Sequence, residues 1–194
     1  FLGKTAINVL LSDEDKVETL GLNERQKGVL MQGIIENNGT EQTIIELNNL
    51  GFSSRITEDI FSRYQEKSLE VIRKDPYSLA TEIRGLGFKR IDQIAQGMGI
   101  SFDDQKRILG AVLTSLYEEC YSNGNTYAND KLLLEKSLQL LEGARSEKVD
   151  PEKVADTIIE AGHKRKIVIE GKRIYPKSLY NSEQEIAYDL YRLM

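Results

Sequence analysis

The sequence has almost no cysteine, proline or histidine, and it has no tryptophan. Its 194 residues include one cysteine, three prolines and one histidine. The single cysteine, Cys120, excludes an internal disulfide and a cysteine-based metal site, and this usage is typical of a protein of the reducing cytoplasm. Because proline is scarce while leucine, isoleucine, glutamate and lysine are common, the composition favours helices.

Two kinds of segment are also missing. No apolar run approaches the roughly 18 residues of a membrane-spanning helix, and no stretch resembles a signal peptide, so we expect no membrane partner. The chain lacks a GxxxxGK[ST] phosphate loop, the glycine-rich loop that cradles the phosphates of a nucleotide. We therefore predict that this chain holds no cofactor, no metal and no catalytic residue, and that it does not hydrolyse ATP.

The formal net charge of −5 argues against a surface covered with DNA-binding charge. Basic residues nevertheless gather between His163 and Lys177, where Glu170 is the only acidic residue. The members of this basic stretch that we select as candidate DNA contacts are Lys164, Arg165, Lys172 and Arg173. Any contact with nucleic acid is therefore expected to be local.

The most informative local pattern is the stretch Arg84-Gly85-Leu86-Gly87-Phe88-Lys89-Arg90. Apolar residues recur behind it at helical spacing, which predicts a helix entered through a tight glycine turn. Gly85 and Gly87 can adopt positive φ and leave the backbone bare. The N–H groups of Phe88 and Lys89 would then face outward at the positive end of the helix dipole, beside the side chains of Lys89 and Arg90. Such a helix start binds phosphate; the alternative is a glycine turn that only packs two helices together.

Two weaker copies of this pattern come earlier in the chain. In Gly21-Leu22-Asn23, asparagine replaces the second glycine, and we expect it to tolerate the left-handed conformation there. In the stretch from Asn49 to Ser53 we take Asn49 as replacing the first glycine, so the next helix is predicted to start one residue late; Gly51 and Ser53 are candidate DNA contacts. The spacings of 28 and 36 residues are too unequal for a solenoid and predict tandem helical hairpins.

These glycine patterns resemble the helix-hairpin-helix motif, in which the hairpin backbone holds a nucleic-acid phosphate without reading sequence. The order of three phrases, Asp75-Pro76-Tyr77, Gly85-Leu86-Gly87-Phe88-Lys89 and Asp92-Gln93-Ile94-Ala95, is similar to the region ahead of the motor in RecD-like ATP-dependent DNA helicases, relatives of the exodeoxyribonuclease V alpha subunit. The resemblance extends over nearly the whole chain. Asp75, Leu86 and Ile91 depart from the family phrase, and none of them removes the glycine turn.

The resemblance implies that the chain is the N-terminal accessory region of a 5′→3′ DNA helicase that acts in DNA repair and recombination. The parent would bind ATP and Mg, and its ATPase domains would follow this region. Those motor domains and single-stranded or forked DNA are the implied partners. We expect the chain to be a segment of a longer protein, since it starts at Phe1 and stops inside an amphipathic helix.

Beyond Ile100 the residue pattern changes. The predicted elements are a helix capped by Ser101, helices over about residues 129–141 and 151–161, a β-hairpin over residues 166–176 that turns at Glu170-Gly171, and a last helix opened by a capping box at residues 182–185. Three helices followed by a hairpin suggest a winged-helix-like module.

Some side chains allow a second interpretation. Asp103 and Asp104 follow the glycines as the catalytic aspartate does in helix-hairpin-helix glycosylases, which makes a base-excision enzyme an alternative. Helix capping also explains both residues. If either one caps a helix in the structure, the base-excision alternative is removed. His163 is expected at the surface and Cys120 in the core. The tyrosines that could stack on bases, although half-buried packing is the simpler expectation, are Tyr175, Tyr180, Tyr188 and Tyr191.

The sequence therefore predicts a mainly α chain in three parts. These are tandem helix-hairpin-helix units over residues 1–100, a winged-helix-like module with one β-hairpin over residues 101–180, and a helix over residues 181–194 that leads toward the ATPase domains. Its predicted function is sequence-independent contact with the DNA backbone. The alternative is an interaction scaffold that positions the motor or a partner protein and has little DNA binding of its own.

Overall fold

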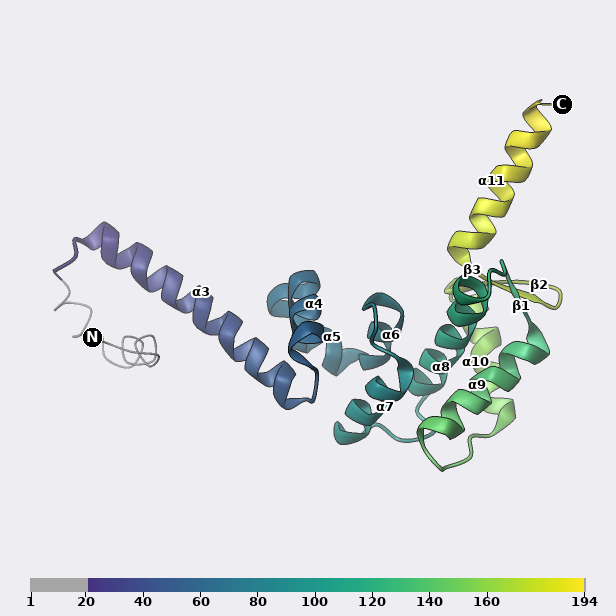
Figure 1. Cartoon of the computed structure of the whole chain (residues 1–194), viewed down its shortest axis with the longest axis horizontal. Helices are drawn as coiled ribbons and strands as arrows, with labels where there is room; N and C mark the ends of the chain where they lie inside the picture. The colour runs from purple at the N-terminus through teal and green to yellow at the C-terminus, as the bar shows by residue number, and fades with distance from the viewer. Residues whose placement is uncertain (1–20, 194) are drawn as a thin grey trace. The chain divides into compact units, whose positions relative to one another are not determined.

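The computed structural model describes residues 21–193 and the side chains of all of these except residues 30, 31 and 33–38. Helices predominate in this range, which confirms the mainly α prediction (Figure 1). The first 20 residues of the predicted helix-hairpin-helix region lie outside the described residues. The chain divides into two compact units between Val71 and Ile72. The predicted domain boundaries at residues 100 and 180 stay a prediction.

The first unit is built on one long helix. Helix α3 (Glu24–Asn49) has 26 residues. A tight turn leads to α4 (Ser54–Tyr64) and a 3-10 turn (Gln65–Lys67). Leu47, Phe52 and Ile60 are buried where α4 folds back on α3, and this contact fixes the turn between them. Helix α5 (Ser68–Lys74) spans the division between the units.

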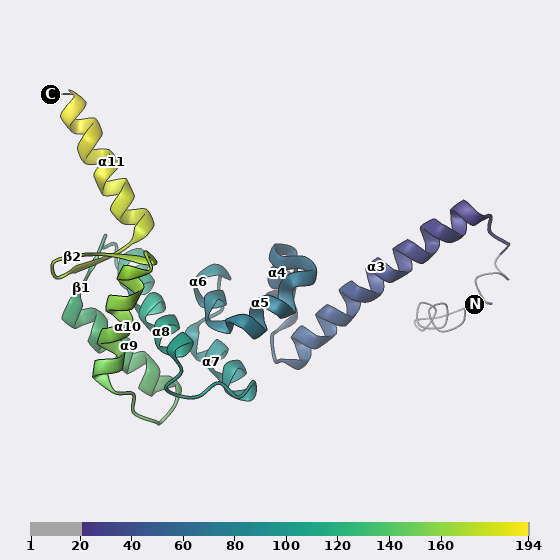
Figure 2. The same ribbon diagram turned by 180° about the vertical axis from the view of Figure 1, so that it is seen from behind.

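The second unit combines helices with a small sheet. Its elements are a 3-10 turn (Pro76–Ser78), α6 (Leu79–Glu82), α7 (Phe88–Gly97), α8 (Gln105–Tyr117), a π-helical turn (Glu118–Ser122), β1 (Ala128–Asn129), α9 (Asp130–Ala144), α10 (Pro151–His163), β2 (Ile167–Glu170), β3 (Arg173–Pro176) and α11 (Lys177–Leu193). Helices α8, α9 and α10 contact one another pairwise, as both views show (Figures 1 and 2). Ile108 and Val112 on α8 are buried in this core, and Cys120 in the π-helical turn is buried as predicted.

The sheet gives the second unit the element order of a winged helix. The predicted hairpin is present as β2 and β3, with Gly171 at the turn in the left-handed region, φ 60°. Strand β1 pairs with the other side of β3, so the sheet order is β1-β3-β2. The sequence pattern missed β1 because it has only two residues. The order α8-β1-α9-α10-β2-β3 places a strand between the first two helices, as winged helices do.

Two predicted helix starts are wrong. The cap of α8 is Asp104, whose carboxylate accepts a hydrogen bond from the Lys106 N–H, and Ser101 instead donates to Asp103. The last helix, α11, begins at Lys177, directly after β3, so the capping-box residues from Ser182 onward lie inside it. A serine followed three residues later by glutamate is compatible with a helix interior, and the strand end at Pro176 decides where α11 begins.

We predict that Gly110→Ala destabilises the fold although alanine favours helices. A Cβ atom on Gly110 would lie 2.5 Å from Cβ of the buried Tyr77, so α8 or the turn at Pro76–Ser78 must shift. Such overpacking costs about 1–3 kcal/mol. Thermal unfolding followed by circular dichroism measures the loss. Gly97→Ala is the control, because a Cβ there meets no atom within 4 Å among the described residues; an unchanged melting temperature for Gly110→Ala would contradict the close contact.

Candidate nucleic-acid interface

Three turns share one backbone conformation. Each begins with a left-handed glycine: φ is 65° at Gly21, 98° at Gly51 and 84° at Gly85. Two residues later comes the cap of the next helix, with an extended backbone in all three cases: φ is −75° at Asn23, −74° at Ser53 and −75° at Gly87. Helices α3, α4 and α7 begin at the residue that follows. The turns are therefore three copies of one hairpin.

This geometry corrects three sequence predictions. Asn23 is extended and not left-handed, because Gly21 makes the turn. Gly51 is the counterpart of the first glycine, so Asn49 does not replace it and α4 does not start late. Gly87 does not adopt positive φ. The second position of the motif is a helix cap, which serine and asparagine fill as well as glycine does.

The cap residue decides whether the amides at the helix start have a partner. The Asn23 side chain accepts a hydrogen bond from the Gln26 N–H at 2.9 Å, and the Gln26 side chain accepts one from the Asn23 N–H at 3.0 Å. The first copy therefore has a capping box, in which these two amides are satisfied within the protein. Ser53 makes no side-chain cap bond. Gly87 has no side chain to make one, although a Cβ there would meet no described atom within 4 Å. The third copy therefore leaves the first amides of α7 uncapped.

The residues after Gly87 divide between core and surface. Phe88 is buried and stacks on Tyr77, with ring centroids 5.6 Å apart, so only its N–H group is available to a ligand. Lys89 is exposed and lies along the last turns of α9, where its Nζ is 3.8 Å from the place of a Cβ on Gly143. Arg90 is exposed and donates to the Gln93 side chain. DNA contact by these residues stays a prediction.

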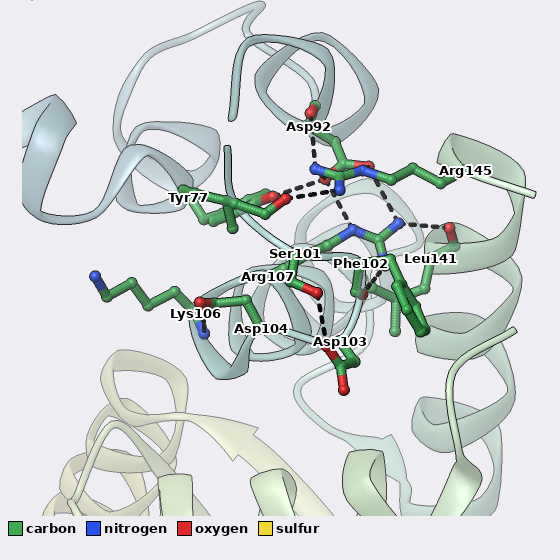
Figure 3. Close-up of polar contacts among 11 residues, drawn as sticks. Tyr77, Asp92, Ser101, Phe102, Asp103, Asp104, Lys106, Arg107, Leu141 and Arg145 are labelled. Atoms are coloured by element: carbon green, nitrogen blue, oxygen red, sulfur yellow. Dashed lines mark hydrogen bonds and ion pairs between the residues drawn. The ribbon is translucent and has the colours of Figure 1, made fainter. Parts of the chain in front are cut away.

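A buried ion cluster holds α7 against α8 and α9 (Figure 3). The carboxylate of Asp92 accepts hydrogen bonds from Arg107 at 2.8 and 3.1 Å, from Arg145 at 3.1 Å twice and from the Tyr77 hydroxyl at 2.7 Å. Asp92 and Arg107 are at most 1% exposed. The remaining donors of the two guanidinium groups reach the backbone carbonyls of Phe102, Leu141, Ile100 and Asp92.

The cluster keeps Asp92 ionised. Burial alone raises the pKa of its carboxyl, but the hydrogen bonds from Arg107 and Tyr77 and the charges of Arg107 and Arg145 outweigh burial, so the pKa lies below its ordinary value of 3.8. Burial, followed by the hydrogen bond to Asp92, raises the pKa of Tyr77. Because Asp92 lies on α7, this cluster fixes the orientation of the hairpin that precedes it.

The cluster also explains the phrase at Asp75-Pro76-Tyr77. The Asp75 carboxylate caps the short turn by accepting from the Tyr77 N–H at 3.1 Å. That turn places the Tyr77 hydroxyl on Asp92 and its ring on Phe88. Tyr77, Phe88 and Asp92, one residue from each of the three sequence phrases, therefore pack together in one core next to the third hairpin.

The predicted basic residues at 164–173 have different surroundings. Lys164 forms an ion pair with Glu160 at 2.6 Å and lines a cleft beside the start of α8. Four lysines and two carboxylates surround this cleft: Lys74, Lys106, Lys164, Lys166, Asp75 and Glu160. Arg165 follows α10, Lys172 lies beside the hairpin turn, and the Arg173 guanidinium lies 5.1 Å from the centre of the Tyr127 ring. Their contact with DNA stays a prediction.

The structure removes the base-excision alternative. Asp104 caps α8, and Asp103 pairs with Lys153 at 2.7 Å on the surface. Cys120 is buried as predicted, and burial followed by the charge of Glu119 raises the pKa of its thiol to about 11, which favours the protonated form at neutral pH. His163 is exposed, as predicted.

The tyrosines are distributed differently from the prediction. Tyr175 is buried between Tyr127 and Tyr180, with ring centroids 5.4 and 5.2 Å away, and belongs to the core. Tyr188 and Tyr191 are exposed on α11. The sequence interpretation missed Tyr117 and Tyr121, whose spacing of four residues on a helix was the available signal.

Among the described residues, no helix is both long and apolar enough to cross a bilayer. In the comparison with known protein families, residues 36–127 match the family model of the ATP-dependent RecD2 DNA helicase HHH domain. The matched range begins within α3 and ends just before β1, so it contains the second and third hairpins and the whole Asp92–Arg107 pair. Over residues 36–127 the chain is therefore similar to the helix-hairpin-helix domain of the RecD2 helicases, as the glycine and aspartate phrases indicated.

Proposed function

We propose that this region holds the DNA backbone for a RecD-like helicase through the third hairpin. The N–H groups of Phe88 and Lys89 would donate hydrogen bonds to one phosphate at the start of α7, and the side chains of Lys89 and Arg90 would add charge. The observation that carries the proposal is Gly87: the fold has room for a capping side chain at this position, yet there is none. Backbone contact of this kind does not depend on base sequence.

The differences among the three copies support a local site. In the first copy the Asn23 side chain already accepts a hydrogen bond from the Gln26 N–H group, so we assign this copy a packing role. The second, with Gly51 and Ser53, has an uncapped helix start and is the weaker candidate. Lys164 and Arg173 already contact Glu160 and Tyr127, so we place them second to the third hairpin.

The remaining parts of the proposal come from the family. The helicase motor, with its ATP and Mg and its 5′→3′ polarity, would lie in domains beyond this chain. The DNA would be single-stranded or forked, and the work would serve repair or recombination in the cytoplasm. This chain would then bind DNA and catalyse no reaction itself.

Fluorescence anisotropy tests the proposal. A labelled single strand and a labelled forked duplex are titrated with the wild-type chain and with Lys89→Glu/Arg90→Glu. We expect the double variant to bind at least about tenfold more weakly, with a salt slope that is smaller by about 2, because each lysine or arginine on a phosphate contributes close to one unit.

The control for this titration is Lys131→Glu/Lys148→Glu, which makes the same change of charge at exposed positions far along the chain from the hairpins. It is expected to lower affinity only slightly. The proposal fails if the wild type does not bind at low salt, or if the hairpin variant binds as tightly as the control.

One observation favours the scaffold alternative. Helix α11 has no buried residue among those described, and Ile186, Leu190 and Leu193, at helical spacing, are 61%, 58% and 84% exposed. An apolar stripe of this kind suits contact with the motor domains. If positioning is the whole function, the wild-type chain will give no anisotropy change in the same titration.

A further inference from the structure

A groove lies directly beside the third hairpin. One side is formed by the hairpin from Ile83 to Gly87, and the other by the end of α8 and its π-helical turn, including Thr114, Tyr117 and Tyr121. Its volume of about 1040 Å³ is that of a small-molecule site. A ligand that fills it touches both the hairpin backbone and the tyrosines.

The two tyrosines form a fixed aromatic surface in this groove. Their rings are stacked, with centroids 5.6 Å apart and planes 9° from parallel. The hydroxyl of Tyr121 hydrogen-bonds to Ser178 Oγ at 2.9 Å, which holds the ring in place. Tyr121 is nevertheless 56% exposed. An exposed ring that is already held in position loses little conformational freedom when a flat partner stacks on it.

The polar groups of the groove suit an uncharged partner. Thr114 is 6% exposed, and its hydroxyl is the one buried side-chain polar atom among the described residues without a hydrogen-bond partner. Glu82 and Glu118 line the groove together with Arg84. A phosphate inside the groove would meet the two carboxylates, whereas a nucleobase carries no charge and presents both a flat face and hydrogen-bonding edges.

We propose that this groove binds an unpaired nucleobase of single-stranded DNA, stacked on Tyr121, next to the phosphate held at Phe88 and Lys89. The inference rests on the proposed function and adds the kind of DNA that the site selects. Bases in a duplex are already stacked on one another, so a site that takes a free base favours a single strand.

The test compares two strands of equal length by anisotropy: oligothymidine and an abasic strand that has the same phosphates and no bases. The wild-type chain is expected to bind oligothymidine about tenfold more tightly. Tyr121→Ala is expected to reduce oligothymidine binding to the abasic level and to leave abasic binding unchanged. Tyr121→Phe, which keeps the ring and loses the contact with Ser178, is expected to retain most of the preference.

The outcomes separate this inference from the function on which it rests. If the wild type binds neither strand, the proposed function fails and this inference fails with it. If the wild type binds both strands equally, only the nucleobase site is overturned. Equal weakening of both strands by Tyr121→Ala also overturns it, because loss of a stacked base cannot affect a strand that has none.

Discussion

Replacement of Asp92 by asparagine is expected to lower the free energy of unfolding by about 3–5 kcal/mol. Asp92 is the one carboxylate between two buried guanidinium groups, those of Arg107 and Arg145. Asparagine has nearly the same shape, so the packing is kept while the negative charge is lost. Two positive charges then remain buried with only carbonyl dipoles to balance them, which is the costly case for a broken buried ion pair.

Chemical denaturation at neutral pH measures this loss. The matched control is Asp103→Asn, the same change at an exposed pair with Lys153, and it is expected to leave the denaturation midpoint close to that of the wild type. Equal midpoints for the two variants would show that the cluster contributes no net stability.

The same carboxylate predicts how stability depends on pH. The pKa of Asp92 is lower in the folded chain than its ordinary value of 3.8, so its contribution is complete above that value and is lost as the pH falls through the lower, folded value. The wild type should therefore lose stability in acid below about pH 4, and Asp92→Asn should lose less over the same range. Parallel acid titrations of the two chains would contradict this assignment.

Gly87→Asp is expected to leave the fold intact and to abolish most DNA binding. The backbone of Gly87 has φ −75°, which any residue adopts, and a Cβ meets no described atom within 4 Å. An aspartate here would cap the amides of α7, which preserves stability or raises it by a few tenths of a kcal/mol. The same carboxylate would occupy the proposed phosphate position, so affinity should fall roughly 100-fold, about 2.7 kcal/mol.

Two variants frame this prediction. Gly85→Ala, unlike Gly87→Asp, should destabilise the fold. The φ of Gly85 is 84°, a conformation that alanine disfavours, so the free energy of unfolding should fall by about 1–2 kcal/mol. Ser53→Asp makes the matched capping change in the second hairpin and is expected to reduce binding much less. If Gly87→Asp binds the labelled strand like the wild type, the amides of α7 do not hold the phosphate.

The sequence predicted the hairpins but not their register. Glycines are visible in a sequence, and they located all three turns. The motif, however, is defined by one left-handed residue and one extended cap, and Asn23, Ser53 and Gly87 are equivalent caps with different side chains. Residue type alone pairs Asn49 with the first glycine of the motif, whereas the left-handed φ identifies Gly51 as the counterpart.

The interactions that hold the site could not be predicted for a different reason. Asp92 belongs to the sequence phrase Asp92-Gln93-Ile94-Ala95, but its partners Arg107 and Arg145 are 15 and 53 residues further along the chain. No local pattern links residues so far apart. The groove at Tyr121 was missed likewise, because it requires the end of α8 to lie beside residues 83–87. Helix content and the β2–β3 hairpin, which depend on neighbours in sequence, were predicted correctly.

The proposed phosphate site of the repeated hairpin depends on the identity of a single residue, the helix cap. All three copies have the same turn, and they differ in the cap side chain. That side chain accepts a hydrogen bond from the helix start in the first copy and accepts none in the second and third. Mutation at that position can open or close a site without a cost to the fold, since each cap residue suits the same backbone. If the hairpins bind DNA as proposed, a chain with several such turns can change which of them does so during evolution while its architecture stays constant.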